Sequence, residues 1–188
     1  MRRQGGRILQ QASGIQRLID NLLLVFRIRA KALPVEMTVE DANDVASEAV
    51  QLVLADPRVR GASVSLEGPP SRIPVEIDRR LLVRALCNVT TNAVVHGGAG
   101  VNVRVRVASG RGTCRIEVSD DGKGIDADHL DCVFDRYYGG ESARGDRAGS
   151  GLGLPIAREL VELMGGSLDV DSSPGKGTTI SIEFATAE

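Results

Sequence analysis

The sequence predicts an α+β fold, a two-layer α/β sandwich with a mixed, mostly antiparallel sheet, preceded by one long helix. Three observations support this. Apolar residues recur at helical spacing in residues 7–30, 41–54, 78–95 and 154–164. They alternate as in strands elsewhere, most clearly at 101–107 and 113–119. The order is a helix, then mixed strands and helices, then hairpins, which is typical of an α+β domain with helices on one face of the sheet.

The first predicted helix, residues 7–30, carries apolar residues at both core positions of a heptad repeat. Such a stripe must be covered, either by another helix in a bundle or dimer or by the chain's own globular domain. Because residues 31–34 read as a link, we favour the bundle. We therefore expect two domains, residues 1–31 and residues 34–188.

The elements after the link follow from alternation, helical spacing and turn residues. Residues 35–39 alternate like a short strand, and the helix at 41–54 has Asp41 or Asn43 as its N-cap. The remaining elements are two strands around a Gly-Pro-Pro turn, a helix, a hairpin, a helix and two closing strands, at residues 61–68, 72–77, 78–95, 101–107, 113–119, 154–164, 167–173 and 178–184.

The composition limits the possible function. The chain has 188 residues with 42% hydrophobic and 26% charged residues, which suits one folded core. Its formal net charge of −2 gives no basic field that would favour nucleic acid. The longest apolar run in the first helix, residues 22–26, is too short to span a bilayer, and no signal peptide precedes it. We expect a cytoplasmic chain, whose parent protein could be membrane-anchored.

The segment SDDGKGID, residues 119–126, sets two carboxylates beside two glycines. A calcium loop is disfavoured, because placing Gly124 sixth puts Lys123 among the ligands and placing Gly122 sixth puts the ligands inside a strand. A tight turn and a nucleotide pocket then remain equally good interpretations of this segment.

Asn88 and Asn92 lie one turn apart beside the apolar face of the helix at 78–95. Asparagine is a poor residue for the middle of a helix, so the pair suggests a task. Amide oxygens are good ligands for a cation such as Mg²⁺ that phosphates also hold. A solvated polar face is the alternative.

A third cluster, GSGLGLP at residues 149–155, ends a long loop without periodicity, residues 136–150, and opens a helix. Backbone N–H groups on glycines, together with the positive end of the helix dipole, form an anion site. A flexible hinge is the alternative. The fourth cluster, GKGT at residues 175–178, is by itself only a turn.

Taken in order, these clusters resemble the ATP-binding catalytic domain of a bacterial sensor histidine kinase, within the GHKL ATPase superfamily. The resemblance runs from about Pro34 to Phe184, and residues 7–30 resemble the second helix of the dimerisation and histidine-phosphotransfer hairpin. The matching motifs are the N box, first glycine box, F box, second glycine box and last glycine motif, at Asn88 and Asn92, residues 120–124, 134–138, 149–154 and 175–178.

The resemblance implies ATP and Mg²⁺ as cofactors and a role for each residue. Asp120 would accept a hydrogen bond from the adenine amino group, with Ser119 or Thr178 nearby. Asn92, helped by Asn88, would hold Mg²⁺. Arg147 of a mobile lid at 136–150 would reach a phosphate, with Arg136 or Arg144 as further candidates. Asn88, Asn92 and Arg147 would be the catalytic residues. The other nucleotide-binding residues would be His96, Gly122, Gly124, Ile125, Tyr138, Gly149, Gly151, Leu152, Gly153, Leu154 and Thr178.

Two positions depart from the family pattern. Val95 stands where the family often has lysine, so Mg²⁺ and lid arginines must meet the phosphate charge. The family's phosphoacceptor histidine is missing, because only His96 and His129 are present and neither has its context. We therefore expect a truncated chain, or one that phosphorylates a partner in trans. The expected partners are ATP, a histidine-bearing helix of the same or another protein, a response regulator receiver domain and, through residues 7–30, a second copy of the chain.

Three rival functions remain. ATPases of the gyrase, mismatch-repair and heat-shock-chaperone type place glutamate where Asn88 stands, as the base that activates water. Anti-sigma-factor serine kinases usually carry that glutamate too, and lack the bundle helix. An ATP-binding adaptor without kinase activity would tend to lose its glycine boxes, which are intact here. Asn88 and residues 7–30 favour the histidine kinase.

Overall fold

The computed structural model describes residues 2–59, 61–136, 138 and 151–187. The chain divides into two units, Met1–Pro34 and Val35–Glu188. The first unit is helix α1 (Arg2–Arg29), which confirms the predicted first helix. In the described part of the chain, no helix is both long enough and apolar enough to cross a membrane.

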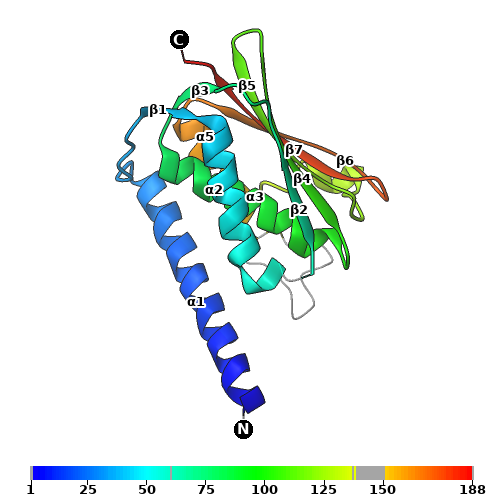
Figure 1. Ribbon diagram of the computed structural model, residues 1–188. Helices are drawn as coiled ribbons and strands as arrows, with labels where there is room; N and C mark the ends of the chain where they lie inside the picture. The colour runs from blue at the N-terminus through cyan, green and yellow to red at the C-terminus, as the bar shows by residue number, and fades with distance from the viewer. Residues whose placement is uncertain (1, 60, 137, 139–150, 188) are drawn as a thin grey trace. The chain divides into compact units, whose positions relative to one another are not determined.

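The second unit contains a five-stranded sheet in the order β2-β4-β5-β7-β6 (Figure 1). The strands β2 and β4 are parallel, and each of the other neighbouring pairs is antiparallel, which confirms the predicted mixed sheet. The bounds of these strands, in sheet order, are Ser63–Glu67, Asn102–Gly110, Thr113–Asp120, Gly177–Ala185 and Ser167–Ser173.

A separate two-stranded antiparallel sheet pairs β1 (Thr38–Asp41) with β3 (Pro74–Ile77). The sequence suggested β2 and β3 as strands around one turn, yet they belong to different sheets. The reason lies at the start of the helix that follows β1. The carboxylate of Asp41 accepts the N–H of Ile73 at 3.2 Å, and Asn43 donates to the carbonyl of Ser71 at 3.1 Å. These bonds hold the segment before β3 next to β1.

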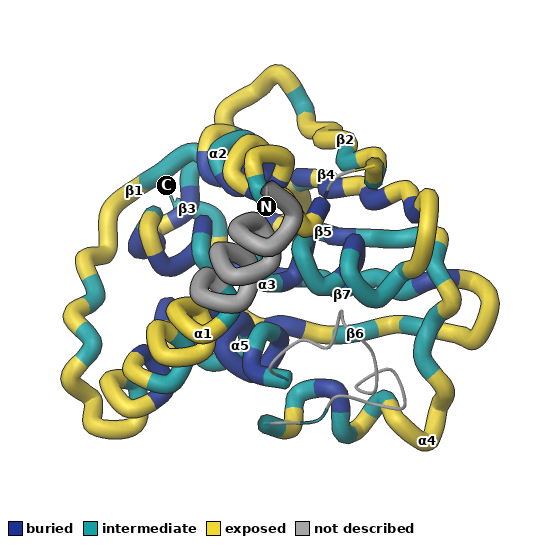
Figure 2. Tube along the Cα trace, turned by 90° about the horizontal axis from the view of Figure 1, so that it is seen from below, coloured by how far each residue is buried: buried dark blue, intermediate teal, exposed yellow. Residues whose placement is uncertain are grey.

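Three helices cover one face of the five-stranded sheet, as predicted (Figure 1). They are α2 (Ala42–Ala55), α3 (Arg79–Gly97) and α5 (Gly153–Leu163). Their buried residues recur at helical spacing, and those of β4, β5 and β7 alternate, so the core lies between the two layers (Figure 2). Two short helices were not predicted, a 3₁₀ turn at Pro57–Val59 and α4 at Ala127–Leu130.

Asp78 begins helix α3 and ties it to the start of the unit. One carboxylate oxygen, Oδ1, accepts the N–H groups of Arg80 and Leu81 at 3.0 and 3.2 Å. The other, Oδ2, accepts the N–H of Glu36 at 3.0 Å and a bond from the Arg80 guanidinium at 3.2 Å. Asp78 is only 1% exposed. A buried carboxylate with four donors fixes the first turn of α3.

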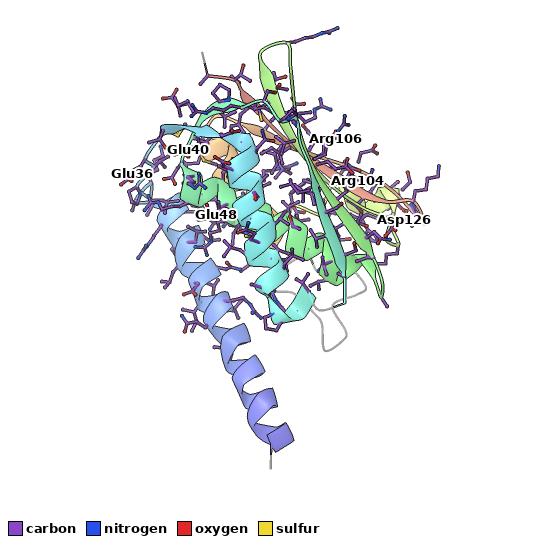
Figure 3. All side chains as sticks on the ribbon, in the orientation of Figure 1. Glu36, Glu40, Glu48, Arg104, Arg106 and Asp126 are labelled. Carbon is purple, nitrogen blue, oxygen red and sulfur yellow. The ribbon has the colours of Figure 1, made fainter. Side chains whose placement is uncertain are left out.

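Arg79 adds a second connection at the same end of α3. Its guanidinium lies 3.0 Å from Glu40 of β1 and 2.8 Å from Glu48 of α2. The glutamates gather at this end of the unit, whereas Arg104 and Arg106 lie on the sheet (Figure 3). The helix whose far end carries Asn92 and His96 is thus anchored at its beginning.

Replacing Asp78 with alanine should lower the free energy of unfolding by about 2 kcal/mol, from the lost N-cap and buried hydrogen bonds. Urea unfolding measures this. Burial alone would raise the pKa of Asp78, but the N–H of Glu36 and the Arg80 guanidinium lower it overall. The stabilisation of the folded state by the ionised Asp78 carboxylate is therefore fully present above pH 3.8. It is lost as the pH falls through the lowered pKa of Asp78.

The matched control is Asp126→Ala. Asp126 occupies the N-cap position of α4 but makes no side-chain capping bond in the described structure. It should therefore change the unfolding free energy by less than about 0.5 kcal/mol. Equal losses in the two variants would contradict the role given to Asp78.

Candidate functional site

A pocket opens beside helix α3, where β5 ends and β7 begins. It holds about 470 Å³ of space, open solvent included. Four sequence clusters that lie far apart in the chain contribute to it: α3, the end of β5 with the loop after it, the start of α5 and the start of β7. The lining residues are Val89, Asn92, Ala93, His96, Gly97, Val118, Asp120, Lys123, Gly124, Ile125, Leu154, Thr178 and Ile180.

Asp120, the last residue of β5, is half-buried in this pocket. Its Oδ1 accepts the N–H of Gly122 at 2.9 Å, and its partner across the ladder is Thr178. Burial raises the pKa of Asp120, and the charge of Asp121 adds to the rise, while the N–H groups of Gly122 and Thr178 oppose it. A desolvated carboxylate in a cleft is a candidate acceptor for an N–H group of a ligand.

The loop after Asp120 is fixed on two sides. Asp121 accepts the backbone and side-chain N–H groups of Asn102, each at 2.7 Å, which ties the loop to the start of β4. A Cβ on Gly122 would lie 2.5 Å from the Cα of Gly97, so only glycine lets the loop lie directly against the end of α3. This close approach brings Asp120 beside the helix.

Ser172 of β6 connects the same loop to β7. Its hydroxyl accepts the N–H of Ile125 at 2.9 Å and donates to the carbonyl of Gly177 at 2.8 Å. It also lies 2.9 Å from the hydroxyl of Thr178. Ile125 and Thr178 are thereby held on one side of the pocket. Nothing in the alternating pattern of this strand distinguished Ser172 from its exposed neighbours.

Helix α3 contributes Asn92 and His96 to the pocket, one turn apart. Asn88, a turn earlier, does not line it; its amide nitrogen is buried and has no hydrogen-bond partner within the described residues. Burial lowers the pKa of His96, and the charge of Lys123 lowers it further, which favours the neutral imidazole. One side of the pocket is therefore polar but carries little charge.

Helix α5 begins at the pocket. Its N-cap residue is the buried Leu152, which makes no side-chain capping bond in the described structure. The N–H groups of Gly153 and Leu154 lie in the first turn, where the helix dipole favours an anion. Leu154 lines the pocket, whereas Gly151, Leu152 and Gly153 do not.

The remaining predicted residues lie elsewhere. Tyr138 is outside the pocket, with its ring 5.8 Å from that of the exposed His129. Arg136, considered as a phosphate ligand, pairs with Glu159 of α5. Ser119, considered near the base, instead contacts the backbone of β4 at 3.5 Å. Arg144, Arg147 and Gly149, which the resemblance placed in a lid, fall outside the described residues.

Several pocket residues were not assigned from the sequence. Val118 and Ile180 are partners across the β5–β7 ladder and, with Val89 and Ala93, give the pocket apolar walls. The alternation of the strands and the period of α3 mark these residues as apolar, but the patterns do not show which strands pair. Lys123 was considered only as an obstacle to calcium binding.

Comparison with known proteins fits this geometry. Residues 77–188 match the family described as histidine kinase-, DNA gyrase B-, and HSP90-like ATPase. The sensor histidine kinase YvrG of Bacillus subtilis is 30% identical over 184 residues, which are 98% of this chain and 32% of YvrG. The probable sensor histidine kinase TcrY of Mycobacterium tuberculosis is 34% identical over 172 residues, which are 90% of this chain and 35% of TcrY. The chain thus spans about a third of the length of these relatives.

Solved structures share the fold. The mycobacterial sensor histidine kinase MprB superposes with a TM-score of 0.67 at 27% identity, covering 80% of this chain and 98% of that one. Full-length ShkA in complex with AMPPNP superposes with a TM-score of 0.80 at 26% identity, covering 98% of this chain and 39% of ShkA. The chain therefore belongs to the histidine kinase-, DNA gyrase B- and HSP90-like ATPase family, and it is similar to the ATP-binding catalytic part of sensor histidine kinases.

Proposed function

We propose that this domain binds ATP together with Mg²⁺ and directs transfer of the γ-phosphate to a histidine that another helix supplies. One observation carries the proposal: Asp120 and Asn92, which belong to different elements, line the same pocket. The related ShkA was solved with AMPPNP, which supports a nucleotide as the ligand. The histidine substrate and a response regulator partner are part of the same proposal.

The adenine base suits the apolar part of the pocket. Val89, Val118 and Ile180 offer surfaces for its faces, and the half-buried Asp120 can accept a hydrogen bond from its amino group. The Thr178 hydroxyl is a further polar group beside the base. A charged acceptor between apolar walls discriminates strongly against a base that lacks the matching donor.

The phosphates and Mg²⁺ suit the two remaining sides of the pocket, which α3 and the start of α5 form. Asn92 is the proposed Mg²⁺ ligand. The buried amide nitrogen of Asn88, which has no hydrogen-bond partner within the described residues, fits a supporting role as a donor to a metal-bound water or a phosphate oxygen. The first-turn N–H groups of α5 are proposed to bind phosphate oxygens. Mg²⁺, when bound, neutralises phosphate charge.

The residue types favour transfer to histidine over hydrolysis. Water needs a base to remove its proton, and an amide such as Asn88 cannot do this. Within the described lining of the pocket, Asp120 is the one carboxylate, and we assign it to adenine. A neutral imidazole nitrogen attacks through its own lone pair and needs no such base. The chain's contribution is then to position the nucleotide and stabilise charge.

Replacing Asn92 with alanine should remove the Mg²⁺ dependence of nucleotide binding. Wild-type protein should bind ATP at least about tenfold more tightly in Mg²⁺ than in EDTA, and the variant about equally in both. Calorimetric titration under the two conditions measures this. A variant that keeps the full wild-type difference would mean that the metal is held elsewhere.

We also propose that residues 1–31 belong to a dimerisation hairpin and residues 34–188 form the catalytic domain. The support is an exposed apolar set on α1, namely Ile15, Leu18, Ile19, Leu23 and Phe26. The chain should self-associate in sedimentation velocity, and Leu23→Glu with Phe26→Glu should weaken this. A wild-type chain that is monomeric at 100-fold higher concentration than that used for binding would contradict the proposal.

A further inference from the structure

Lys123 brings a positive charge to the nucleotide pocket. Of the described residues that line the pocket, it is the one lysine or arginine, and Asp120 is the one carboxylate. The other lining residues are apolar, glycine, amide, hydroxyl or the half-buried His96. The pocket thus combines one negative and one positive side chain, which suits a ligand with a neutral base at one end and an anionic group at the other.

The backbone around Lys123 is held firmly in place. Its carbonyl accepts the N–H of Gly175 at 2.7 Å, from the turn between β6 and β7. On one side, Gly122 donates to Asp120 and lies against the end of α3. On the other, Ile125 donates to Ser172. A loop with hydrogen bonds at Gly122, Lys123 and Ile125 cannot easily move away, so the lysine side chain projects from a fixed position.

The positive charge of Lys123 influences the α3 side of the pocket. Burial lowers the pKa of His96 most, and the charge of Lys123 lowers it further. Lys123 is itself exposed and lines the pocket. An anionic group of a ligand that enters the pocket near His96 would therefore meet a positively charged side chain.

We propose that Lys123 binds the phosphate chain of the nucleotide at its ribose-proximal end and so helps the pocket to select nucleotides over nucleosides. This inference rests on the proposed function. Asp120 would recognise the base, and Lys123 would recognise the first phosphate. A lysine at this place acts as a point charge, so its effect should be electrostatic and should weaken as ionic strength rises.

The test is calorimetric titration of the full chain with ADP and with adenosine at low ionic strength, without Mg²⁺. Lys123→Ala should bind ADP about 5- to 20-fold more weakly than wild type, as expected for one charge-assisted contact. Its adenosine affinity should stay within about twofold. Lys123→Arg should retain most of the ADP affinity, because it retains the charge. The matched control is Lys176→Ala, in the turn between β6 and β7 and outside the pocket lining.

The outcomes separate this inference from the proposed function. Equal ADP affinity in Lys123→Ala and wild type would overturn the role of Lys123 and leave ATP binding intact. An equal loss of adenosine and ADP affinity would also overturn it, because the lysine would then act on the base or the fold. Wild-type protein that binds no adenine nucleotide would overturn the proposed function, and this inference with it.

Discussion

Replacing Asp120 with asparagine should weaken ATP binding by about 100-fold while the domain stays folded. The amide that replaces one carboxylate oxygen can present a donor to the adenine amino group, and a hydrogen bond to a charged partner contributes about 1.5–3 kcal/mol. The remaining oxygen can still accept the N–H of Gly122. Because the pKa of Asp120 is raised, its ionised form is disfavoured in the folded state, so the neutral variant should be at least as stable.

Asp121→Asn is the matched control for this variant. The neighbouring carboxylate is exposed, and its oxygens bond to Asn102 rather than face the pocket. ATP affinity should therefore change by less than about threefold. Calorimetry gives the affinities, and thermal unfolding shows whether each variant is folded. A folded Asp120→Asn protein with wild-type affinity would remove adenine recognition from this pocket.

Replacing Gly177 with alanine should destabilise the domain by about 3–5 kcal/mol. Gly177 has a φ of 84°, and an added Cβ would lie 1.8 Å from the carbonyl oxygen of Asp120. The left-handed conformation costs about 1–2 kcal/mol, and a collision with backbone adds more, because backbone cannot rotate away as a side chain can. The melting temperature should fall by roughly 10 °C. Since the collision is with Asp120 itself, nucleotide affinity should fall as well.

Gly175→Ala separates backbone strain from this collision. Gly175 lies two residues earlier with a φ of 74°, but an added Cβ there would meet no heavy atom within 4 Å. It should cost only about 1 kcal/mol, or a few degrees in melting temperature. If the two alanine variants lose the same stability, the close packing of Gly177 on Asp120 is not what requires glycine there.

Local patterns predicted the elements of this fold well. The hairpin of β4 and β5 follows from valines at every second position and a short turn, and α5 follows from Pro155 in its first turn and its apolar period. The partners of the strands were harder to predict. The separation of β2 from β3 depends on side-chain bonds from Asp41 and Asn43 across about 30 residues of sequence, which no local pattern contains.

The candidate site was predicted from the order of its motifs more than from any one of them. Asn92 and Asp120 each had a plain structural explanation, and only the resemblance to a family brought them together. The neighbours that decide the detailed geometry were not predicted, because their roles depend on contacts between distant segments. The Ser172 hydroxyl contacts Ile125 and Thr178, which belong to other segments, and the charge of Lys123 lowers the pKa of His96 on α3.

The most direct test of the account is calorimetric titration of the chain with a non-hydrolysable ATP analogue, with and without Mg²⁺. We predict one site per chain, tighter binding when Mg²⁺ is present, and loss of that site in Asp120→Asn. Wild-type protein that gives no binding heat and no thermal stabilisation with either form of the analogue would contradict the claim that this pocket holds ATP.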